Sequence, residues 1–327
     1  MTNFRDTIDM KHLYQELCRA RFFQEKLLST GTPCYTEFGE EAISVGSVYG
    51  MRPDDIVSCY FRGEGSVIRM KGGVTINDQM ACWKGRMPES GIISATLPSA
   101  WTDVENGVIG TTSSLIGADA DIAVGVAMAQ KMQNTGKAVL FLAGDGACSK
   151  GNFHEMFNFA SLYKLPLVVM VRGNGWAMST NVERNTHVSN IPAMAEPFGF
   201  KTKTVDGNNV LEIAEAVREA AEYAATTGPY LIEAKTYRVS GHSPNDEDDY
   251  RDPSIKAEWQ KKDPLLNLEK EMLLAGVSPE EINATRLAII QEVDQAYEWS
   301  QGRPVLKVEE YYNRQTRIIN KMWGDLA

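Results

Sequence analysis

Short, uniformly apolar runs alternate along most of the chain with longer stretches of helical periodicity. The runs 138–143 and 165–171 are the clearest, and 56–61 and 230–237 show a weaker strand-like pattern. Helical spacing of apolar residues covers 10–29, 39–49, 117–132 and 208–225, with one further helix between the two apolar runs. Strands that alternate with helices at this spacing predict an α/β fold with a mostly parallel, helix-covered sheet.

Two parts of the chain depart from this alternation. Residues 84–110 are irregular and rich in glycine, proline and serine, which predicts a long surface or active-site loop. From residue 251 onward the pattern contains amphipathic helices, over 264–275 and 279–299, without a strand signal. We therefore expect an α/β domain over 1–250 and a helical C-terminal extension over 251–327, packed on the core or on a partner.

Composition narrows the class of protein. The 327 residues carry a net charge of −10, with a pI of about 5.1, and 43% of them are apolar. This acidic balance argues against nucleic-acid binding, because phosphate contacts need basic patches. Five scattered cysteines without a C-x-x-C pair favour a reducing compartment, and no apolar run is long enough to span a membrane. We expect a cytoplasmic enzyme that is not bound to a membrane.

Each of the two clear apolar runs ends at a polar residue flanked by glycine. Asp145 lies within Gly-Asp-Gly and Asn174 within Gly-Asn-Gly, 29 positions apart (174 − 145), which is the length of one crossover. Carboxylate and amide oxygens suit Mg²⁺, which commonly keeps phosphate and water as further ligands. A helix that starts near Lys150 offers free N–H groups to phosphate. The pattern favours a metal–phosphate site over the alternative of two plain turns.

The segment 144–174 resembles the thiamine-diphosphate motif, and the residues within and just after this segment make the resemblance more specific. Residues 151–160 read Gly-Asn-Phe-His-Glu-Met-Phe-Asn-Phe-Ala, and 173–180 read Gly-Asn-Gly-Trp-Ala-Met-Ser-Thr. Both resemble the α subunit of the E1 component of 2-oxo acid dehydrogenases. Other segments fit this family in its order along the chain: 38–42, 52–55, 61–63, 205–208, 236–238 and 241–243. The resemblance covers most of the chain and implies the thiamine-diphosphate-binding fold.

The resemblance also implies a role for each matching residue. Asp145 and Asn174 would bind Mg²⁺ or Ca²⁺ through side-chain oxygens, and Trp176 would do so through its backbone carbonyl. The positions implied for binding thiamine diphosphate are Phe61, Arg62, Ser114, Ile116, Gly146, Ala147, Arg172 and His242. The two arginines would hold the diphosphate, for which a planar guanidinium is well suited. Ser114 and Ile116 occupy positions whose backbone meets the aminopyrimidine in relatives.

His242 and two glutamates allow more than one interpretation. In the family that it resembles, His242 lies near the thiazolium and the diphosphate, positions the cofactor and assists acyl transfer to lipoyl. Without the motif a histidine is more often structural, so the catalytic assignment depends on the Gly-His-Ser sequence at 241–243. Glu40 and Glu41 are either carboxylates on the substrate side or parts of a solvated helix N-terminus.

Several positions depart from the family pattern. Phe61 replaces the usual Tyr, which removes a hydroxyl donor worth about 1 kcal/mol in binding. Gly173 replaces the first Asn of an Asn-Asn pair, Glu64 replaces a His, and Asp119 and Asp121 replace the Gln and Pro of Gln-x-Pro. Most of these positions surround the substrate pocket, so the departures leave the metal site intact and the 2-oxo acid undefined.

One essential group has no counterpart in this sequence. Thiamine diphosphate requires a glutamate at its N1′ atom, which heterotetrameric members of the family receive from a β subunit. The resemblance therefore implies an α2β2 assembly that decarboxylates a small 2-oxo acid and passes the acyl group to a lipoyl-bearing E2. Two alternatives remain: a ligase-type relative that passes the same fragment to a carbonyl acceptor without lipoyl, and a non-catalytic paralogue.

Overall fold

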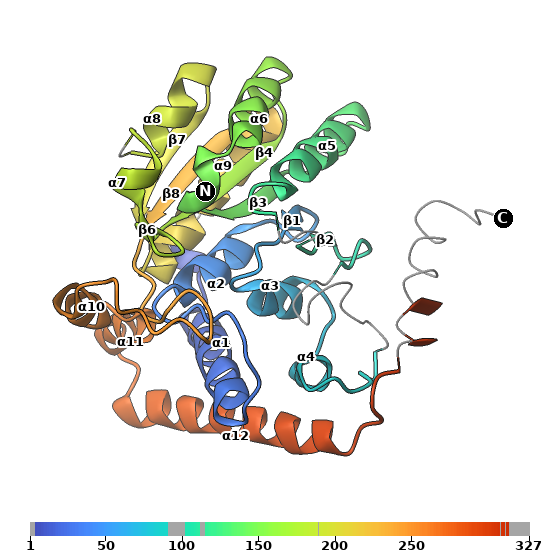
Figure 1. Ribbon diagram of the computed structural model, residues 1–327, viewed down its shortest axis with the longest axis vertical. Coiled ribbons are helices and arrows are strands. Elements are labelled where there is room, and N and C mark those ends of the chain that lie inside the picture. The colour runs from blue at the N-terminus through green and yellow to red at the C-terminus, as the bar shows by residue number, and fades with distance from the viewer. Residues whose placement is uncertain are drawn as a thin grey trace.

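The computed structural model describes residues 4–90, 102–111, 115–188, 190–307, 309–310 and 312–313. Its centre is a six-stranded parallel sheet in the order β2-β1-β3-β4-β8-β7 (Figure 1). The strands are β1 (Ile56–Ser58), β2 (Val108–Ile109), β3 (Val139–Gly144), β4 (Leu167–Gly173), β7 (Lys201–Asp206) and β8 (Tyr230–Lys235). The predicted α/β class and the mostly parallel sheet are confirmed.

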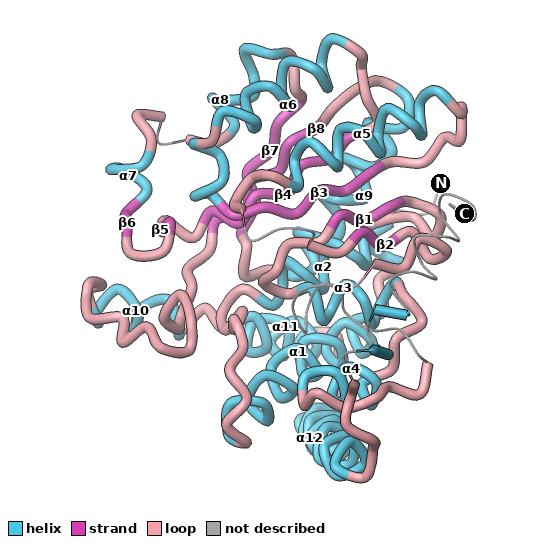
Figure 2. Tube along the Cα trace, turned by 45° about the vertical axis from the view of Figure 1, so that its right-hand side comes forward, coloured by secondary structure: helices cyan, strands magenta, loops and turns pink. Residues whose placement is uncertain are grey.

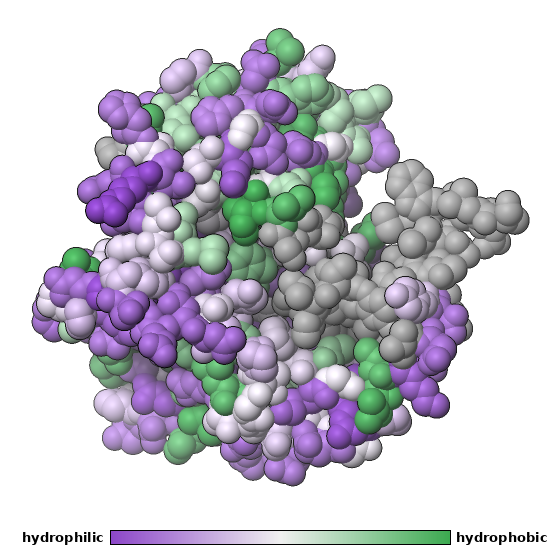
Figure 3. All heavy atoms as spheres, in the orientation of Figure 1, coloured by the Kyte–Doolittle hydropathy of each residue, from purple (hydrophilic) through white to green (hydrophobic). Residues whose placement is uncertain are grey.

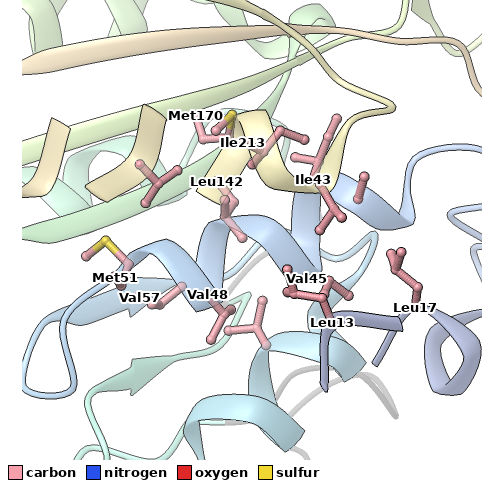
Figure 4. Packing of buried hydrophobic residues seen from close by; sticks show 14 of the residues in the cluster. Leu13, Leu17, Ile43, Val45, Val48, Met51, Val57, Leu142, Met170 and Ile213 are labelled. Atoms are coloured by element: carbon pink, nitrogen blue, oxygen red, sulfur yellow. The ribbon is translucent and has the colours of Figure 1, made fainter. Parts of the chain in front are cut away.

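Helices cover both faces of the sheet, as Figure 2 shows. One face carries α5 (Asp119–Met132), α6 (Gly151–Leu162) and α8 (Pro192–Ala195), and the other carries α2 (Glu41–Gly50) and α9 (Val210–Thr226). Side chains of β3 alternate between two hydrophobic clusters, with Phe141 toward α5 and α6 and Leu142 toward α2 (Figure 4). Because successive side chains of a strand point to opposite faces, a uniformly apolar run is what a strand buried on both faces requires.

A layer of helices lies beyond α2. It contains α1 (Met10–Ser29), α3 (Glu64–Lys71), α4 (Ile76–Trp83), α10 (Pro253–Gln260), α11 (Pro264–Leu274) and α12 (Pro279–Gln301). Helix α12 packs along α1 and α4, and its residues Ile289 and Val293 belong to the same hydrophobic cluster as Leu13 and Leu17 of α1. Among the helices after residue 250, α11 and α12 therefore pack on the core. The division into a 1–250 domain and a 251–327 extension stays a prediction.

The strong periodic segments were predicted well and the weak ones were not. Helix α1 begins and ends at the predicted residues, because an Asp9 cap fixes its start and Gly31 follows its end. Among the elements that were missed are α3, α4 and the strand β7. The sequence of β7, Lys-Thr-Lys-Thr-Val-Asp, is mostly polar because it forms the sheet edge. Within the described residues, each helix is too short or too polar to cross a membrane.

The remaining elements are short. They are η1 (Phe4–Thr7), η2 (Asp145–Ser149), the hairpin strands β5 (Trp176–Ala177) and β6 (Thr180–Asn181), α7 (Val182–Asn185) and η3 (Glu196–Phe198). The 3₁₀ turn η2 and the hairpin follow directly on β3 and β4, respectively. They therefore place the residues after each strand at the carboxyl edge of the sheet.

Candidate active site

Asp145 and Asn174 follow neighbouring parallel strands. Gly144, the last residue of β3, is paired with Arg172 near the end of β4, so the two chains leave the sheet side by side. Asp145 accepts a hydrogen bond from the backbone N–H of Gly175 at 2.6 Å and another from that of Gly146 at 2.8 Å. The spacing of 29 residues thus corresponds to one strand-to-strand crossover, as the sequence predicts.

Both side chains are buried and oriented. Burial raises the pKa of Asp145 to about 6, with a further contribution from the nearby Glu40 carboxylate, while the N–H groups of Gly175 and Gly146 act in the opposite direction. The Oδ1 atom of Asn174 accepts a hydrogen bond from the Trp176 backbone N–H at 3.0 Å. A bound cation would favour the charged form of Asp145, because an opposite charge offsets the cost of burying a carboxylate.

A cleft of about 200 Å³ opens beside these residues. Its lining includes eight of the residues predicted from the sequence: Arg62, Ile116, Asp145, Gly146, Ala147, Asn174, Trp176 and His242. It also includes Tyr60, Lys150, Met178 and Arg238, among others. A cleft at the carboxyl ends of parallel strands is typical of a cofactor site in an α/β protein. The predicted Ser114 lies outside the described residues.

The two predicted arginines lie in different surroundings. Arg62 lines the cleft, where its guanidinium donates to the backbone oxygens of Thr36 and His242. Arg172 does not line the cleft: its guanidinium donates to Ser44, to the Glu37 carboxylate at 3.4 Å and to the Glu40 backbone oxygen at 3.2 Å. Arg172 therefore contacts the helix α2 region behind the cleft.

His242 lies at the wall of the cleft next to two arginines. Its backbone N–H donates to Asp246 at 2.6 Å, and its ring nitrogen is 3.4 Å from Arg238. Burial, together with the charges of Arg62 and Arg238, lowers the pKa of His242 to about 4. The imidazole is therefore neutral at pH 7. Phe61, the other predicted residue outside the cleft lining, has its ring centroid 6.2 Å from that of His242.

The sequence interpretation missed several residues of the site. Arg238 is the clearest, because its side chain is buried, lines the cleft and donates to the Tyr250 hydroxyl at 3.2 Å. The sequence could have indicated Arg238, because this residue lies in the 236–238 segment that resembles the family. The solvated alternative for Glu40 and Glu41 is wrong, because both side chains are 0% exposed. No pattern in the sequence separates a buried helix N-terminus from a solvated one.

The residues present fit a divalent cation together with an anionic group. The described residues contain no cluster of three or more His, Cys, Asp and Glu that could hold a metal by themselves. Asp145, Asn174 and the Trp176 carbonyl carry oxygen atoms of the kind that such a cation prefers, and phosphate and water would supply its further ligands. A side chain on Gly146 would come within 2.7 Å of Ala177, so only glycine fits at this turn. The Nε atom of Arg62 is buried without a hydrogen-bond partner.

This fold and cleft define an α/β protein with a cleft at the carboxyl edge of its parallel sheet, the place where such folds bind cofactors. Comparisons with known proteins identify the family to which this α/β protein belongs. Residues 16–309 match the model of the family described as "Dehydrogenase E1 component". The chain therefore belongs to the dehydrogenase E1 component family, and the resemblance stated from the sequence is confirmed.

Characterised relatives agree with this membership. The chain is 34% identical to the 2-oxoisovalerate dehydrogenase subunit alpha of Bacillus subtilis over 272 residues, which cover 81% of each protein. It is 31% identical to the pyruvate dehydrogenase E1 component subunit alpha of Zymomonas mobilis over 319 residues, 94% of this chain and 88% of that one. The corresponding subunit of Acholeplasma laidlawii is 31% identical over 277 residues, 84% of this chain and 74% of that one.

Proposed function

We propose that this chain is the α subunit of an α2β2 thiamine-diphosphate enzyme that decarboxylates a small 2-oxo acid and passes the acyl group to lipoyl on an E2 partner. The observation that carries the proposal is the convergence of Asp145, Asn174 and Arg62 on one cleft in a member of the E1 component family. The relatives named above are all dehydrogenase subunits, so the carbonyl-ligase alternative is not favoured.

Asp145, Asn174 and the Trp176 carbonyl would hold Mg²⁺ or Ca²⁺. A single carboxylate leaves the metal with net positive charge toward the diphosphate, which a second carboxylate would repel. When bound, thiamine diphosphate supplies the electron-accepting group that removal of CO₂ from a 2-oxo acid requires. The chain's own residues bind and orient this group.

The remaining predicted residues divide by the part of the cofactor that they would meet. Arg62 would contact the diphosphate directly, while Gly146 and Ala147 let it approach the backbone. Arg172, which lies behind the cleft, would act on the same anion through its positive charge. Ser114, Ile116 and Phe61 would complete the cofactor site. Arg238 adds a second cleft arginine to this set.

His242 would contribute a neutral imidazole. Its lowered pKa, about 4, keeps the ring uncharged at pH 7, so it can accept a proton or donate one from nitrogen without first losing a charge. Arg238 and Asp246 hold its ring and backbone in place. A neutral base at the cleft wall suits a residue that assists acyl transfer.

Exposed apolar side chains support a protein partner on the α5–α6 face. Figure 3 shows hydrophobic surface near the lower ends of these helices, where they begin. Ile122 lies in the first half of α5, and large apolar side chains are also exposed toward the other ends of the two helices: Met132, Phe159, Leu162 and Tyr163. Such a surface fits a β subunit that brings the N1′ glutamate to the cofactor. The five buried, free cysteines support a cytoplasmic location, since reducing compartments preserve thiols.

Reconstitution with the β subunit tests the proposal. The purified complex would be supplied with pyruvate and branched-chain 2-oxo acids, first with an artificial electron acceptor and lipoyl-E2, and separately with carbonyl acceptors. We expect Mg²⁺- and thiamine-dependent decarboxylation with lipoyl acylation. Formation of a new C–C bond without lipoyl acylation would contradict the dehydrogenase assignment.

A matched pair of variants tests the metal assignment. Asp145→Ala should abolish Mg²⁺-dependent activity, because it removes the only carboxylate in the proposed donor set. Asp206→Ala removes an exposed carboxylate at the end of β7, on the same sheet edge but outside the cleft lining, and should leave activity unchanged. If Asp145→Ala kept wild-type activity and metal dependence, the cofactor assignment would be wrong.

A further inference from the structure

Glu40 is a carboxylate buried directly behind the cleft, at the N-terminus of α2. Its side chain is 0% exposed. Its Oε1 atom accepts a hydrogen bond from Asn174 Nδ2 at 3.1 Å. Its Oε2 atom is buried without a hydrogen-bond partner and lies 3.8 Å from the Nε atom of Arg62, which also has none. A buried carboxylate is destabilising unless it is satisfied, so this position needs an explanation beyond packing.

The contact with Glu40 fixes the orientation of the Asn174 amide. A carboxylate oxygen accepts hydrogen bonds, so the group of Asn174 that faces Glu40 is its NH₂. The backbone N–H of Trp176 only donates, so the group that faces Trp176 is the amide oxygen. Because Glu40 can only accept and the Trp176 N–H can only donate, the flipped orientation of the Asn174 amide is excluded. The flipped amide would present its NH₂ group where a cation needs oxygen.

Glu40 also contacts both arginines of the predicted diphosphate site. Its side chain lies beside Arg62, and its backbone oxygen accepts a hydrogen bond from Arg172 at 3.2 Å. The N-cap residue of α2 therefore contacts the amide that follows β4 and two positive charges.

We infer that Glu40 is a positioning residue for the metal site, which holds the oxygen of Asn174 toward the cation and the guanidinium of Arg62 toward the cleft. The inference rests on the proposed function, because it presumes that Asn174 binds a metal. Residues that orient metal ligands typically change metal affinity 10–100-fold when they are replaced. Glu40 is not among the residues that line the cleft, so we assign it a positioning role and not a catalytic one.

The test measures metal affinity separately from turnover. Thiamine diphosphate would be titrated calorimetrically into the α–β complex at a series of Mg²⁺ concentrations, which gives the Mg²⁺ concentration for half-maximal binding. Glu40→Met keeps the length of the side chain and removes the acceptor, and should raise this concentration about 10–100-fold. Glu40→Gln keeps an acceptor for Asn174 and should stay within about 3-fold of wild type.

Glu41 provides the matched control. It is the adjacent residue and is equally buried, but it pairs with Arg21 on the side away from the cleft. Glu41→Met should lower the thermal unfolding temperature and leave the Mg²⁺ requirement within about 3-fold of wild type. If Glu40→Met does not fold, Glu40→Asp, which withdraws the acceptor by one methylene, should show the same rise of at least about 10-fold.

Two results separate the inference from the proposed function. A wild-type complex that bound thiamine diphosphate without Mg²⁺ dependence, or not at all, would contradict the proposed function. Normal Mg²⁺-dependent binding in wild type, with an unchanged Mg²⁺ requirement in the folded Glu40→Met or Glu40→Asp variant, would overturn the role of Glu40 alone. So would an equal loss in Glu40→Gln and Glu40→Met, because restoring the acceptor would then have no effect.

Discussion

Gly63 lies where the chain turns from Arg62 into helix α3, and its replacement by alanine should be strongly destabilising. Its φ of +86° falls in the left-handed region, which L-residues adopt at a cost of about 1–2 kcal/mol. A Cβ atom here would also lie 1.8 Å from Ser44 Oγ and 2.3 Å from Glu37 Oε2. Both atoms belong to the buried group that Arg172 contacts, so they cannot move without breaking its hydrogen bonds.

The magnitude follows from these two contributions. A hydrogen bond to a charged group contributes about 1.5–3 kcal/mol, and the clash breaks at least one of them. Added to the backbone cost, this loss leads us to expect that Gly63→Ala lowers the free energy of unfolding by about 2.5–5 kcal/mol. Urea denaturation of the full chain, followed by circular dichroism, measures this change.

Two other glycines separate the contributions. Gly31 has a φ of +74°, but the position that a Cβ atom would occupy there has no other atom within 4 Å. Gly31→Ala should therefore lose only the backbone contribution of about 1–2 kcal/mol. Gly65 lies in α3 with open space around it, so Gly65→Ala should gain about 0.5–1 kcal/mol. If Gly63→Ala and Gly31→Ala cost the same within about 0.5 kcal/mol, the clash argument is refuted.

Two further predictions concern titration and thiol chemistry. Because the pKa of His242 is lowered from 6.5 to about 4, the unfolded chain binds a proton here before the folded chain does, so the folded state loses stability as pH falls from 6.5 toward 4. His242→Asn should reduce this loss of stability. An equal shift of the urea midpoint between pH 7 and pH 5 in the wild type and in the variant would contradict the prediction. Burial raises the pKa of Cys18 and Cys34 to about 12, and all five thiols are buried. Iodoacetamide at pH 8 should therefore label the chain only after unfolding, and rapid labelling of the native chain would contradict the burial.

The sequence predicts the parts of the site that strands position. Uniformly apolar runs over β3 and β4 locate Asp145 and Asn174 at neighbouring strand ends, because parallel strands present the same edge. Motif resemblance then adds Arg62 and His242, which lie far apart in the sequence but line the same cleft. For these residues the prediction needed only the crossover length and the order of the motifs.

The contacts behind the cleft could not be predicted in this way. Whether Arg172 faces the cleft or the Glu37–Ser44 pair depends on how α2 packs against β4, and no periodicity encodes that contact. The burial of Glu40 could not be predicted for the same reason. A charged helix N-terminus has the same sequence pattern whether it is exposed to solvent or covered by other elements. Strand β7 was missed since its edge position tolerates a polar sequence, so tertiary context decided its structure.

The order of the strands also determines when the cleft can form during folding. Its contributors, including Glu40 behind it, range from residue 40 to residue 242, a separation of 202 positions (242 − 40), and they meet only after the parallel crossovers are complete. Such non-local pairing forms slowly, so a chain that is still emerging or is cut before residue 242 has no complete site. Cofactor binding should therefore act on the finished fold alone. It should slow unfolding without speeding folding, and so lengthen the lifetime of the native chain.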